Sequence, residues 1–336
     1  MLEIALIGAG RIGQIHARNI ARNPGAHLRW ITDVNAEAAG KLAQELGAQA
    51  GTDAAKAIQD PAVNAVVICS STDTHADMIE IAAKAGKAIF CEKPIDLSLE
   101  RVDRCLETVR KAGVTMMIGF NRRFDANFAA VHEGIRSGKI GKLETLIVTS
   151  RDPGPPPIGY IKVSGGLFRD MMIHDFDIVR WLLGEAPTEL YATASNLVDP
   201  EIGKAGDIDT AMVIFKTKSG AIAQISNSRR AVYGYDQRIE AFGSKGMLQA
   251  GNQTATTVSF SGEPGVTADK PLHFFLERYD AAYRAELQHF IDCCLGKTKP
   301  ATSIEDGRNA LALAEGAVQS LKTGQPVKLG SGPTVH

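Results

Sequence analysis

The first 120 residues alternate short, continuously apolar segments with longer amphipathic ones. A continuous apolar core is typical of a parallel strand covered on both faces, whereas apolar residues at helical spacing indicate an amphipathic helix. Strands that alternate with helices across short loops predict a doubly wound parallel sheet of the α/β class. The predicted strands cover residues 2–7, 27–32, 65–69, 88–91 and 115–120, and the predicted helices cover 12–23, 36–46, 74–85 and 98–111.

After Phe120 the pattern changes to strands in which apolar and polar residues alternate. This period of two is typical of antiparallel strands, and two glycine-containing segments, 218–220 and 243–246, suit hairpin turns. We therefore predict a first domain over residues 1–120 and a second over 121–336, the second of α+β type with an antiparallel or mixed sheet. Its predicted helices cover 127–137, 170–183, 278–295 and 304–322, and its predicted strands cover 190–195, 210–217, 221–227, 239–242 and 247–250.

Length and composition agree with two folded domains. The chain has 336 residues, of which 44% are hydrophobic and 22% charged, and this balance argues against intrinsic disorder. Its 37 basic and 38 acidic residues give a formal net charge of −1, so we expect neither a nucleic-acid binder nor a polybasic membrane-surface protein. Glycine is enriched, at 33 residues, which is typical of many turns or of backbone close to a ligand.

The cysteines and the first residues indicate a cytoplasmic protein. The five cysteines, at positions 69, 91, 105, 293 and 294, form no CxxC motif and no zinc-ligand spacing, so we expect reduced thiols and no metal site. Residues 1–8 carry a short apolar run without a basic lead, which favours a buried strand over a signal peptide. No segment approaches the ~18 apolar residues of a membrane span, so we expect no membrane association.

Residues 4–13 contain a strand that leads through GxGxxG into a helix, which is the context that this motif requires in a dinucleotide site. Gly8 would form the tight turn, Gly10 would admit a pyrophosphate, and Gly13 would allow the helix to pack closely on the strand. The helix that begins at Arg11 and Ile12 would add amide donors and its dipole. The first domain is therefore predicted to be a Rossmann domain.

The second predicted strand ends on Asp33, about 20 residues after the glycine loop. A carboxylate at this place can accept hydrogen bonds from both ribose hydroxyls and would repel a 2′-phosphate, so NAD is favoured over NADP. Asp33 could instead be an acid that stabilises the N-terminus of the helix predicted over 36–46.

Lys93 is the first catalytic candidate, because Glu92-Lys93-Pro94 follows a strand at the carboxyl edge, where a doubly wound sheet binds ligands. A lysine there can donate to a substrate oxygen and to the nicotinamide ribose. Pro94 would lock the loop, and a cis peptide bond is one way to do so. Taken alone, a lysine after a strand could equally be a solvated surface charge.

Asp170, His174 and Asp177 form the second candidate set, because their spacing places them on one face of the predicted helix 170–183. A histidine with a carboxylate one turn away is oriented and has its charged form stabilised, so it can act as a general base. The alternative is a helix N-terminal acid beside a histidine satisfied in the core. A two-histidine metal site is disfavoured, since no second histidine lies at ligand spacing.

Together, the glycine loop, Glu92-Lys93-Pro94 and the pattern Gly165-Gly166-x3-Asp170-x3-His174 resemble the glucose–fructose oxidoreductase/inositol dehydrogenase superfamily over essentially the whole chain. Segments 119–125, 150–153, 161–170 and 228–238 are similar to its bacterial inositol 2-dehydrogenases. The resemblance implies NAD-dependent oxidation of the axial hydroxyl of myo-inositol to scyllo-inosose. It also implies a second domain whose open, mostly antiparallel sheet is the interface of a homo-oligomer, usually a tetramer.

The resemblance also assigns roles to residues that match its motifs. Lys93, Asp170 and His174 match the catalytic set: His174 would take the hydroxyl proton, Asp170 would balance its charge, and Lys93 would hydrogen-bond the same oxygen. The implied substrate contacts are Lys93, Arg151, Asp170, His174, Asp177 and Tyr235, and the implied cofactor contacts beyond the glycine loop and Asp33 are Ser70, Ser71, Thr72, His75, Glu92, Lys93 and Asn121.

Two alternatives to this function stay open at the level of the sequence. An enzyme of the same fold could act on another cyclitol or sugar, such as scyllo-inositol, glucose or an anhydrosugar. The scaffold could also be a non-catalytic NAD-binding regulator, but such a protein could dispense with Lys93 and His174, and this sequence keeps both.

Overall fold

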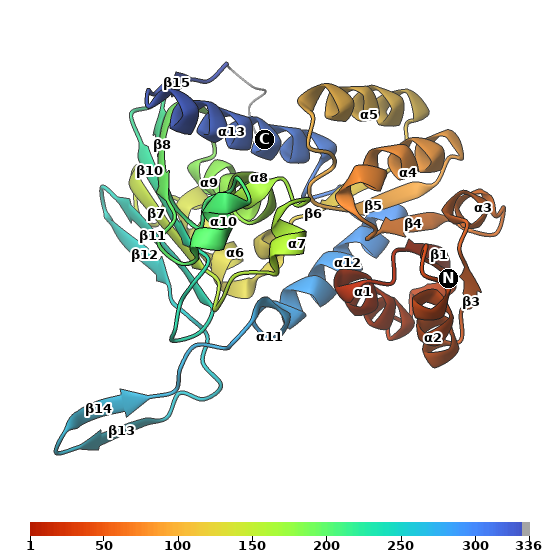
Figure 1. Ribbon diagram of the computed structural model, residues 1–336, viewed down its shortest axis with the longest axis horizontal. Helices are drawn as coiled ribbons and strands as arrows, with labels where there is room; N and C mark the ends of the chain where they lie inside the picture. The colour runs from red at the N-terminus through yellow and green to blue at the C-terminus, as the bar shows by residue number, and fades with distance from the viewer. Residues whose placement is uncertain (331–336) are drawn as a thin grey trace. The chain divides into compact units, whose positions relative to one another are not determined.

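The computed structural model describes residues 1–330, which form two compact units (Figure 1). The first unit consists of Met1–Phe124 and Ala282–Leu311, and the second consists of Asp125–Ala281 and the chain from Ala312 onward. The division expected at residue 120 gave everything after it to the second domain. In the structure, a late segment returns to the first unit instead.

The first unit is built on a six-stranded sheet in which all neighbouring strands are parallel. Its strand order, β3-β2-β1-β4-β5-β6, is that of a dinucleotide-binding Rossmann fold, so the predicted fold class is confirmed. The short strand β3 and the helix α3 escaped the prediction. The strands are β1 (Leu2–Ile7), β2 (Ala26–Thr32), β3 (Gln49–Gly51), β4 (Ala65–Ile68), β5 (Ala88–Glu92) and β6 (Met116–Gly119), and the helices are α1 (Arg11–Ala21), α2 (Ala36–Leu46), α3 (Ala54–Gln59), α4 (Thr72–Lys84) and α5 (Leu99–Ala112).

The core of the first unit is completed by the helix α12 (Asp280–Cys294), which comes from the end of the chain. Its buried residues Leu287, Phe290 and Ile291 belong to the same apolar cluster as β1 and β2. The predicted helix 278–295 is divided in the structure, because the short α11 (Phe275–Arg278) precedes α12. The 3₁₀ helix η1 (Asn121–Phe124) closes the first part of the unit.

The second unit is built on a seven-stranded sheet with the order β12-β11-β7-β10-β9-β8-β15. Only β7 and β10 pair in parallel, and the other five pairs are antiparallel, so the expected mostly antiparallel sheet is confirmed. Strand β7 lies inside the sheet and was not predicted. The strands are β7 (Leu143–Arg151), β8 (Pro187–Ser195), β9 (Thr210–Thr217), β10 (Ile222–Ser228), β11 (Asp236–Gly243), β12 (Gly246–Ala250) and β15 (Val327–Lys328).

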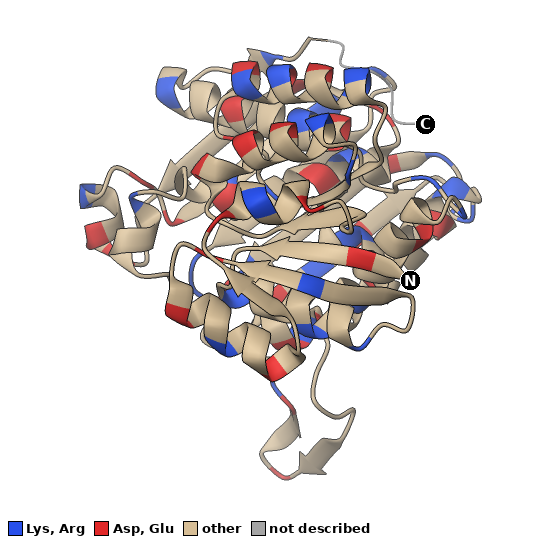
Figure 2. Ribbon diagram, turned by 90° about the vertical axis from the view of Figure 1, so that its right-hand side faces the viewer, with Lys and Arg blue, Asp and Glu red and all other residues tan. Residues whose placement is uncertain are grey.

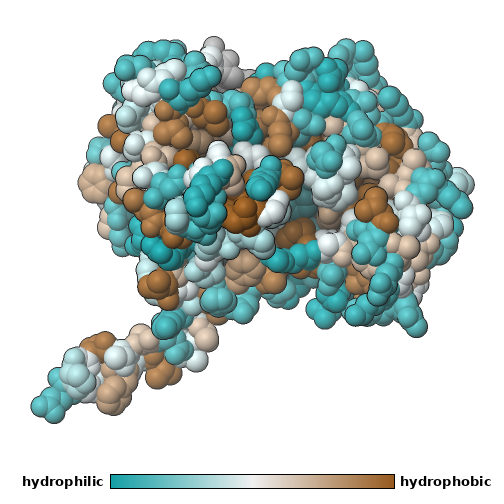
Figure 3. Space-filling view, in the orientation of Figure 1, coloured by the Kyte–Doolittle hydropathy of each residue, from teal (hydrophilic) through white to brown (hydrophobic). Residues whose placement is uncertain are grey.

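Helices cover one face of this sheet. The helix α6 (Ala126–Arg136) packs on β11 and β12, and α9 (Ile173–Leu183) packs on β7. The hairpin of β13 (Ser259–Gly262) and β14 (Gly265–Ala268) projects from the unit, with apolar side chains exposed on it (Figures 1 and 3). The remaining helices are α7 (Ile158–Ile161), α8 (Gly166–Asp170), α10 (Pro200–Lys204) and α13 (Ile304–Thr323), the last of which spans the division between the units.

The other face of the seven-stranded sheet is open and carries apolar side chains. Because side chains alternate between the faces of a strand, buried Val213 and Phe215 on β9 leave Met212 and Ile214 on the open side. The exposed apolar residues of these strands are Ile147, Tyr191, Met212, Ile214, Ile222, Phe242 and Met247.

The helix predicted over residues 170–183 is interrupted in the structure. The helix α8 ends at Asp170, α9 begins at Ile173, and the Met171–Met172 turn separates them. At this turn the Met172 amide donates to Leu167, five residues back, so the regular helical hydrogen bonding breaks. Asp170 and His174 therefore belong to consecutive helices, while His174 and Asp177 share α9.

Charged residues of both signs lie side by side in the view of Figure 2. Figure 2 shows lysine, arginine and acidic residues interspersed along the helices, which agrees with the net charge of −1. No helix among residues 1–330 is long and apolar enough to cross a membrane.

Candidate active site

The glycine loop between β1 and α1 has the shape that a pyrophosphate site requires. A Cβ on Gly13 would lie 1.9 Å from the carbonyl oxygen of Gly8, so the helix packs on the turn as closely as backbone allows. A Cβ on Gly10 would meet no atom within 4 Å, and Gly10, as the N-cap of α1, brings no side-chain acceptor to the helix N-terminus. The loop therefore leaves a backbone-lined space in front of an amide terminus, which fits a dinucleotide phosphate.

Asp33 follows β2 at the same edge of the sheet as this loop. Its Oδ2 accepts from the Ala9 amide at 2.7 Å, and its Oδ1 accepts from the Asn35 amide at 2.8 Å. The carboxylate is thereby fixed beside the glycine loop, where the sequence places a ribose partner. The helix α2 that follows is capped by the side chain of Asn35, so Asp33 is not its N-cap.

The loop after β4 is joined to the loop after β5 by His75. This buried histidine has its Nδ1 2.8 Å from the carbonyl oxygen of Pro94 and its Nε2 3.0 Å from that of Ser70. Burial lowers the pKa of His75, and the hydrogen bonds to the two carbonyls oppose this only in part. Both ring nitrogens thus face protein oxygens, and we infer that His75 shapes these loops.

Lys93 is partly exposed between two buried neighbours, Glu92 and Pro94, at the carboxyl end of β5. The Lys93–Pro94 peptide bond is cis. Asn121, at the end of β6, is buried. Each expected cofactor contact ends a strand of the parallel sheet, follows one, or begins the next helix. The fold therefore brings these residues to one edge of the sheet together with the glycine loop: Ser70, Ser71, Thr72, His75, Glu92, Lys93 and Asn121.

His16 is a buried partner of this edge that the sequence did not reveal. Its Nε2 lies 2.8 Å from Oε1 of Glu92, and the ring packs against Phe90 and Tyr283. Glu92 in turn lies so close to Gly119 that a Cβ there would be 2.9 Å from its carboxyl carbon. Glu92 thus connects α1 to the loop that carries Lys93. The two residues of the His16–Glu92 pair are 76 positions apart in the sequence.

The second unit holds the expected acid and base at the junction of α8 and α9. His174 is the one residue of 171–180 that is not buried, although its Nδ1 atom is itself covered. Asp170 is partly buried, and its Oδ1 accepts from the Tyr160 hydroxyl at 2.9 Å. Asp177 is buried on α9.

Tyr235 directly precedes β11, and Arg151 ends β7. Tyr235 is buried, with its ring perpendicular to that of Tyr279. The Arg151 guanidinium donates to the Tyr233 hydroxyl at 3.0 Å and lies 3.5 Å from the Asp236 carboxylate. Since Ser150 faces the helices and strands alternate, Arg151 points to the open face of the sheet. The structure does not bring Arg151 into the Asp170–His174 cluster.

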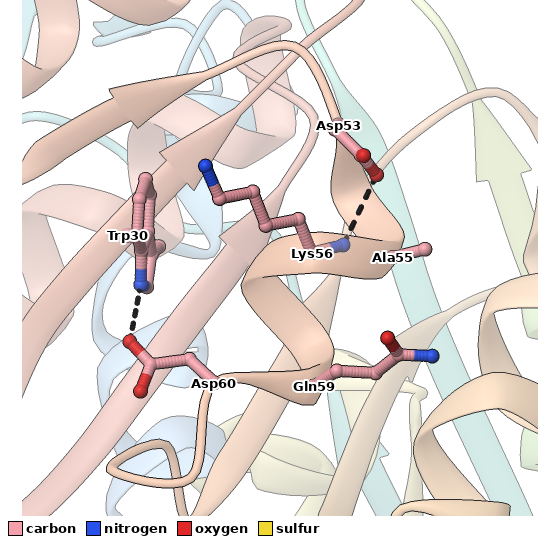
Figure 4. Close-up of a pocket in the computed structure, with 6 residues that line it drawn as sticks. All are labelled: Trp30, Asp53, Ala55, Lys56, Gln59 and Asp60. Carbon is pink, nitrogen blue, oxygen red and sulfur yellow. Dashed lines mark hydrogen bonds between the residues drawn. The ribbon is translucent and has the colours of Figure 1, made fainter.

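A separate hollow of about 440 Å³ lies in the first unit between Trp30 and α3 (Figure 4). Its acids already have partners: Asp60 accepts from the Trp30 indole and from Arg29, and Asp53 caps α3. These hydrogen bonds lower the pKa of Asp60 strongly. The acids of the hollow are therefore engaged in structural hydrogen bonds. In the described part of the chain, no cluster of three or more His, Cys, Asp or Glu side chains could hold a metal ion.

Comparison with known proteins identifies relatives over almost the full length. The chain is 50% identical over 329 residues to a myo-inositol 2-dehydrogenase of Thermotoga maritima, with 98% of each chain covered. It is 51% identical over 322 residues to an inositol 2-dehydrogenase of Rhizobium meliloti, with 95% of this chain and 97% of the relative covered.

A solved structure supplies the same fold with ligands bound. The scyllo-inositol dehydrogenase of Lactobacillus casei, with bound NAD(H) and scyllo-inositol, superimposes with a TM-score of 0.91 at 29% identity, and the match covers 98% of this chain and 99% of that chain. Residues 2–120 match the model of an oxidoreductase family with an NAD-binding Rossmann fold, and residues 128–249 match the GFO/IDH/MocA C-terminal domain. The protein is therefore an NAD-binding oxidoreductase of the GFO/IDH/MocA family.

Proposed function

We propose that this oxidoreductase oxidises the axial secondary alcohol of myo-inositol to scyllo-inosose. The observation that carries the proposal is the identity of about one residue in two to relatives named for this substrate, across nearly the whole chain. Lys93 and His174 are partly exposed between buried neighbours, and Asp170 is partly exposed beside buried Met171, which supports a role in chemistry rather than in solvation.

In the proposed reaction, His174 removes the proton from the substrate hydroxyl. Lys93 donates a hydrogen bond to the same oxygen and stabilises the negative charge that develops there. Asp170 balances the charge that His174 acquires. Bound NAD supplies the hydride acceptor. The remaining hydroxyls of a polyol require polar contacts, for which Asp177 and Tyr235 are our candidates, and such contacts discriminate against analogues that leave them unpaired.

The substrate is tested by initial rates with NAD on myo-inositol, scyllo-inositol and glucose, repeated with NADP. We expect the highest kcat/KM with myo-inositol and NAD, because Asp33 would repel a 2′-phosphate. The similarity to a scyllo-inositol dehydrogenase makes scyllo-inositol the second candidate. Absence of activity on myo-inositol would contradict the proposed substrate.

The catalytic roles are tested by Lys93→Ala and His174→Ala. Each should lower kcat by about 10²- to 10⁴-fold, the range for loss of a proton-transfer or charge-stabilising group. NADH binding, followed by fluorescence, should survive in both variants. Full activity in either variant would remove that residue from the mechanism.

We also propose a homotetramer that associates through the open face of the seven-stranded sheet. Several of its exposed apolar residues share one row across the strands: Ile147 lies beside Gln224, which is opposite Ile214, which is opposite Tyr191. Exposed apolar residues gathered on one sheet face mark an interaction site more often than residues scattered singly.

We place the protein in the cytoplasm. Its five cysteines are all free, and burial raises the pKa of Cys69 and Cys91 well above the ordinary value. Unpaired, protonated thiols suit a reducing compartment. Fractionation of the source cells tests this, and recovery from an extracytoplasmic fraction would contradict it.

A further inference from the structure

A buried arginine, Arg229, lies between two carboxylates beside the proposed catalytic helices. Its side chain is 1% exposed, and its Nη2 lies 3.4 Å from Oδ2 of Asp207 and 3.9 Å from Oδ2 of Asp170. Its Nε has no hydrogen-bond partner among the described residues. A desolvated guanidinium with so few neutral partners depends on these two acids for its charge balance.

Asp207 is built into the start of α8. Its Oδ1 accepts from the Leu167 amide at 3.0 Å, and a Cβ on Gly166 would lie 2.8 Å from that same oxygen. Gly166 also has φ +83°, a conformation that side chains disfavour. The second glycine of the Gly-Gly-x3-Asp-x3-His pattern is therefore needed where Asp207 approaches the backbone.

Asp170 is consequently held at both of its oxygens. The Tyr160 hydroxyl donates to Oδ1, and Arg229 faces Oδ2. Tyr160 lies on α7, Asp207 follows α10, and these two helices pack together. Arg229 follows β10, and its backbone amide donates to the Asp209 carbonyl at 2.8 Å. Tyr160 and Arg229 thus meet at the Asp170 carboxylate, and Asp207 holds Arg229 from its other side.

We propose that Arg229, itself held by Asp207, is a positioning residue that fixes the Asp170 carboxylate for the reaction. This inference rests on the proposed function, in which Asp170 balances the charge on His174. Arg229 acts through Asp170 and contributes its charge from a buried place, so its loss changes turnover more than substrate binding. The fork of an arginine can face two carboxylates, which the single ammonium of a lysine serves less well.

The test is a double-mutant cycle of Arg229→Met and Asp170→Asn. Arg229→Met should lower kcat about 100-fold, as expected when a reacting group is misplaced by about 1 Å, with KM changed less than about threefold. In the Asp170→Asn background, Arg229→Met should lower kcat by a further factor of less than about three, because the carboxylate that Arg229 positions is already absent. Arg229→Lys should recover part of the lost kcat. Equal, additive losses in both backgrounds would overturn the proposal, because a merely structural role does not depend on Asp170.

Two further variants serve as a control and as a fallback if Arg229→Met does not fold. Arg230→Met removes the neighbouring exposed arginine, whose guanidinium donates to the carbonyls of Leu197 and Val198, and should leave kcat unchanged. If Arg229→Met does not fold, Asp207→Asn/Arg229→Met removes one carboxylate together with the guanidinium. With an unchanged Tm it should still lose kcat, and wild-type kcat in that folded variant would overturn the proposal.

The cycle is run on whichever polyol the wild-type protein oxidises. Activity on a polyol other than myo-inositol therefore contradicts the proposed substrate but leaves the test of Arg229 intact. A wild-type protein inactive on every polyol contradicts the proposed function before any variant is compared, and the role of Arg229 is then rejected with it.

Discussion

Gly10 and Gly13 are three residues apart in one motif, yet they have opposite surroundings. Gly13 is closed against the Gly8 carbonyl, whereas Gly10 faces open space and has an ordinary φ of −68°. One glycine therefore serves the packing of the protein, and the other serves its ligand.

The pair predicts two separable defects. Gly13→Ala should lower the stability of the first unit by at least about 2 kcal/mol, because the added methyl group would overlap the Gly8 backbone, which would have to shift. Gly10→Ala should leave Tm unchanged and raise the Kd for NAD about tenfold, since the methyl group occupies the space of the phosphate. Thermal unfolding and NADH fluorescence titration measure both, and a reversed pattern would contradict the assignment.

Asp209 predicts a pH-dependent contribution to stability. This buried carboxylate accepts from the amides of Leu197, Val198 and Asp199 and from the Thr210 hydroxyl. Burial favours the neutral form, but the amides outweigh it and hold the pKa of Asp209 below its ordinary value. The unfolded chain thus takes up a proton at a higher pH than the folded one, so this stabilisation is present above about pH 4 and is lost as the pH falls below it.

Asp209→Asn should therefore lower the free energy of unfolding by about 2–3 kcal/mol at pH 7, because the buried amides lose a charged acceptor. The difference from wild type should shrink as the pH is lowered from about 5 to 3. Denaturant unfolding across this range measures it, and a constant difference would show that the charge of Asp209 is not what stabilises the loop.

Among the elements, β7 shows what the local pattern could not supply. The strand is exposed at Glu144 and Thr145, and then buries Val148, Thr149 and Ser150 in succession, so it shows neither a clean alternation nor a continuous apolar run. Its polar Ser150 is hydrogen-bonded to the side chain of Gln237, 87 residues away. The parallel strands of the first unit, by contrast, were recognisable because each is apolar along its own length.

The same contrast divides the candidate site. Gly10, Gly13 and Asp33 follow from a motif that is local in sequence. His16 with Glu92, and Arg229 with Asp207, depend on pairings between distant segments that only the folded chain reveals. The break between α8 and α9 was missed for a related reason: Met171 and Met172 continue the apolar helical pattern although the hydrogen bonding does not.

Because β7 lies between β10 and β11, substitutions at its buried and exposed positions should differ in their effect on stability. Leu146→Ala, at a buried position, should destabilise the second unit by about 2–5 kcal/mol through the cavity it leaves. Glu144→Ala, two residues earlier and exposed, should change stability by less than about 0.5 kcal/mol. Urea unfolding compares them, and equal losses would mean that β7 is not an internal strand.

For the whole molecule, the open sheet face predicts a test of assembly. Ile214→Lys places a charge in the middle of the apolar rows, where burial in an interface would desolvate it. It should reduce the mass found by light scattering relative to wild type. Leu197→Lys, at an exposed apolar residue outside the strands, should leave the mass unchanged. An unaltered mass in Ile214→Lys would exclude this face as the interface.

The return of α12 to the first unit also has a consequence for biosynthesis. Leu287, Phe290 and Ile291 complete the apolar cluster around β1 and β2, yet the ribosome adds them more than 150 residues after the last strand of that sheet. The first unit therefore lacks part of its apolar core until nearly all of the second unit has been synthesised. The unit whose synthesis begins first therefore completes its core only after most of the other unit has been made.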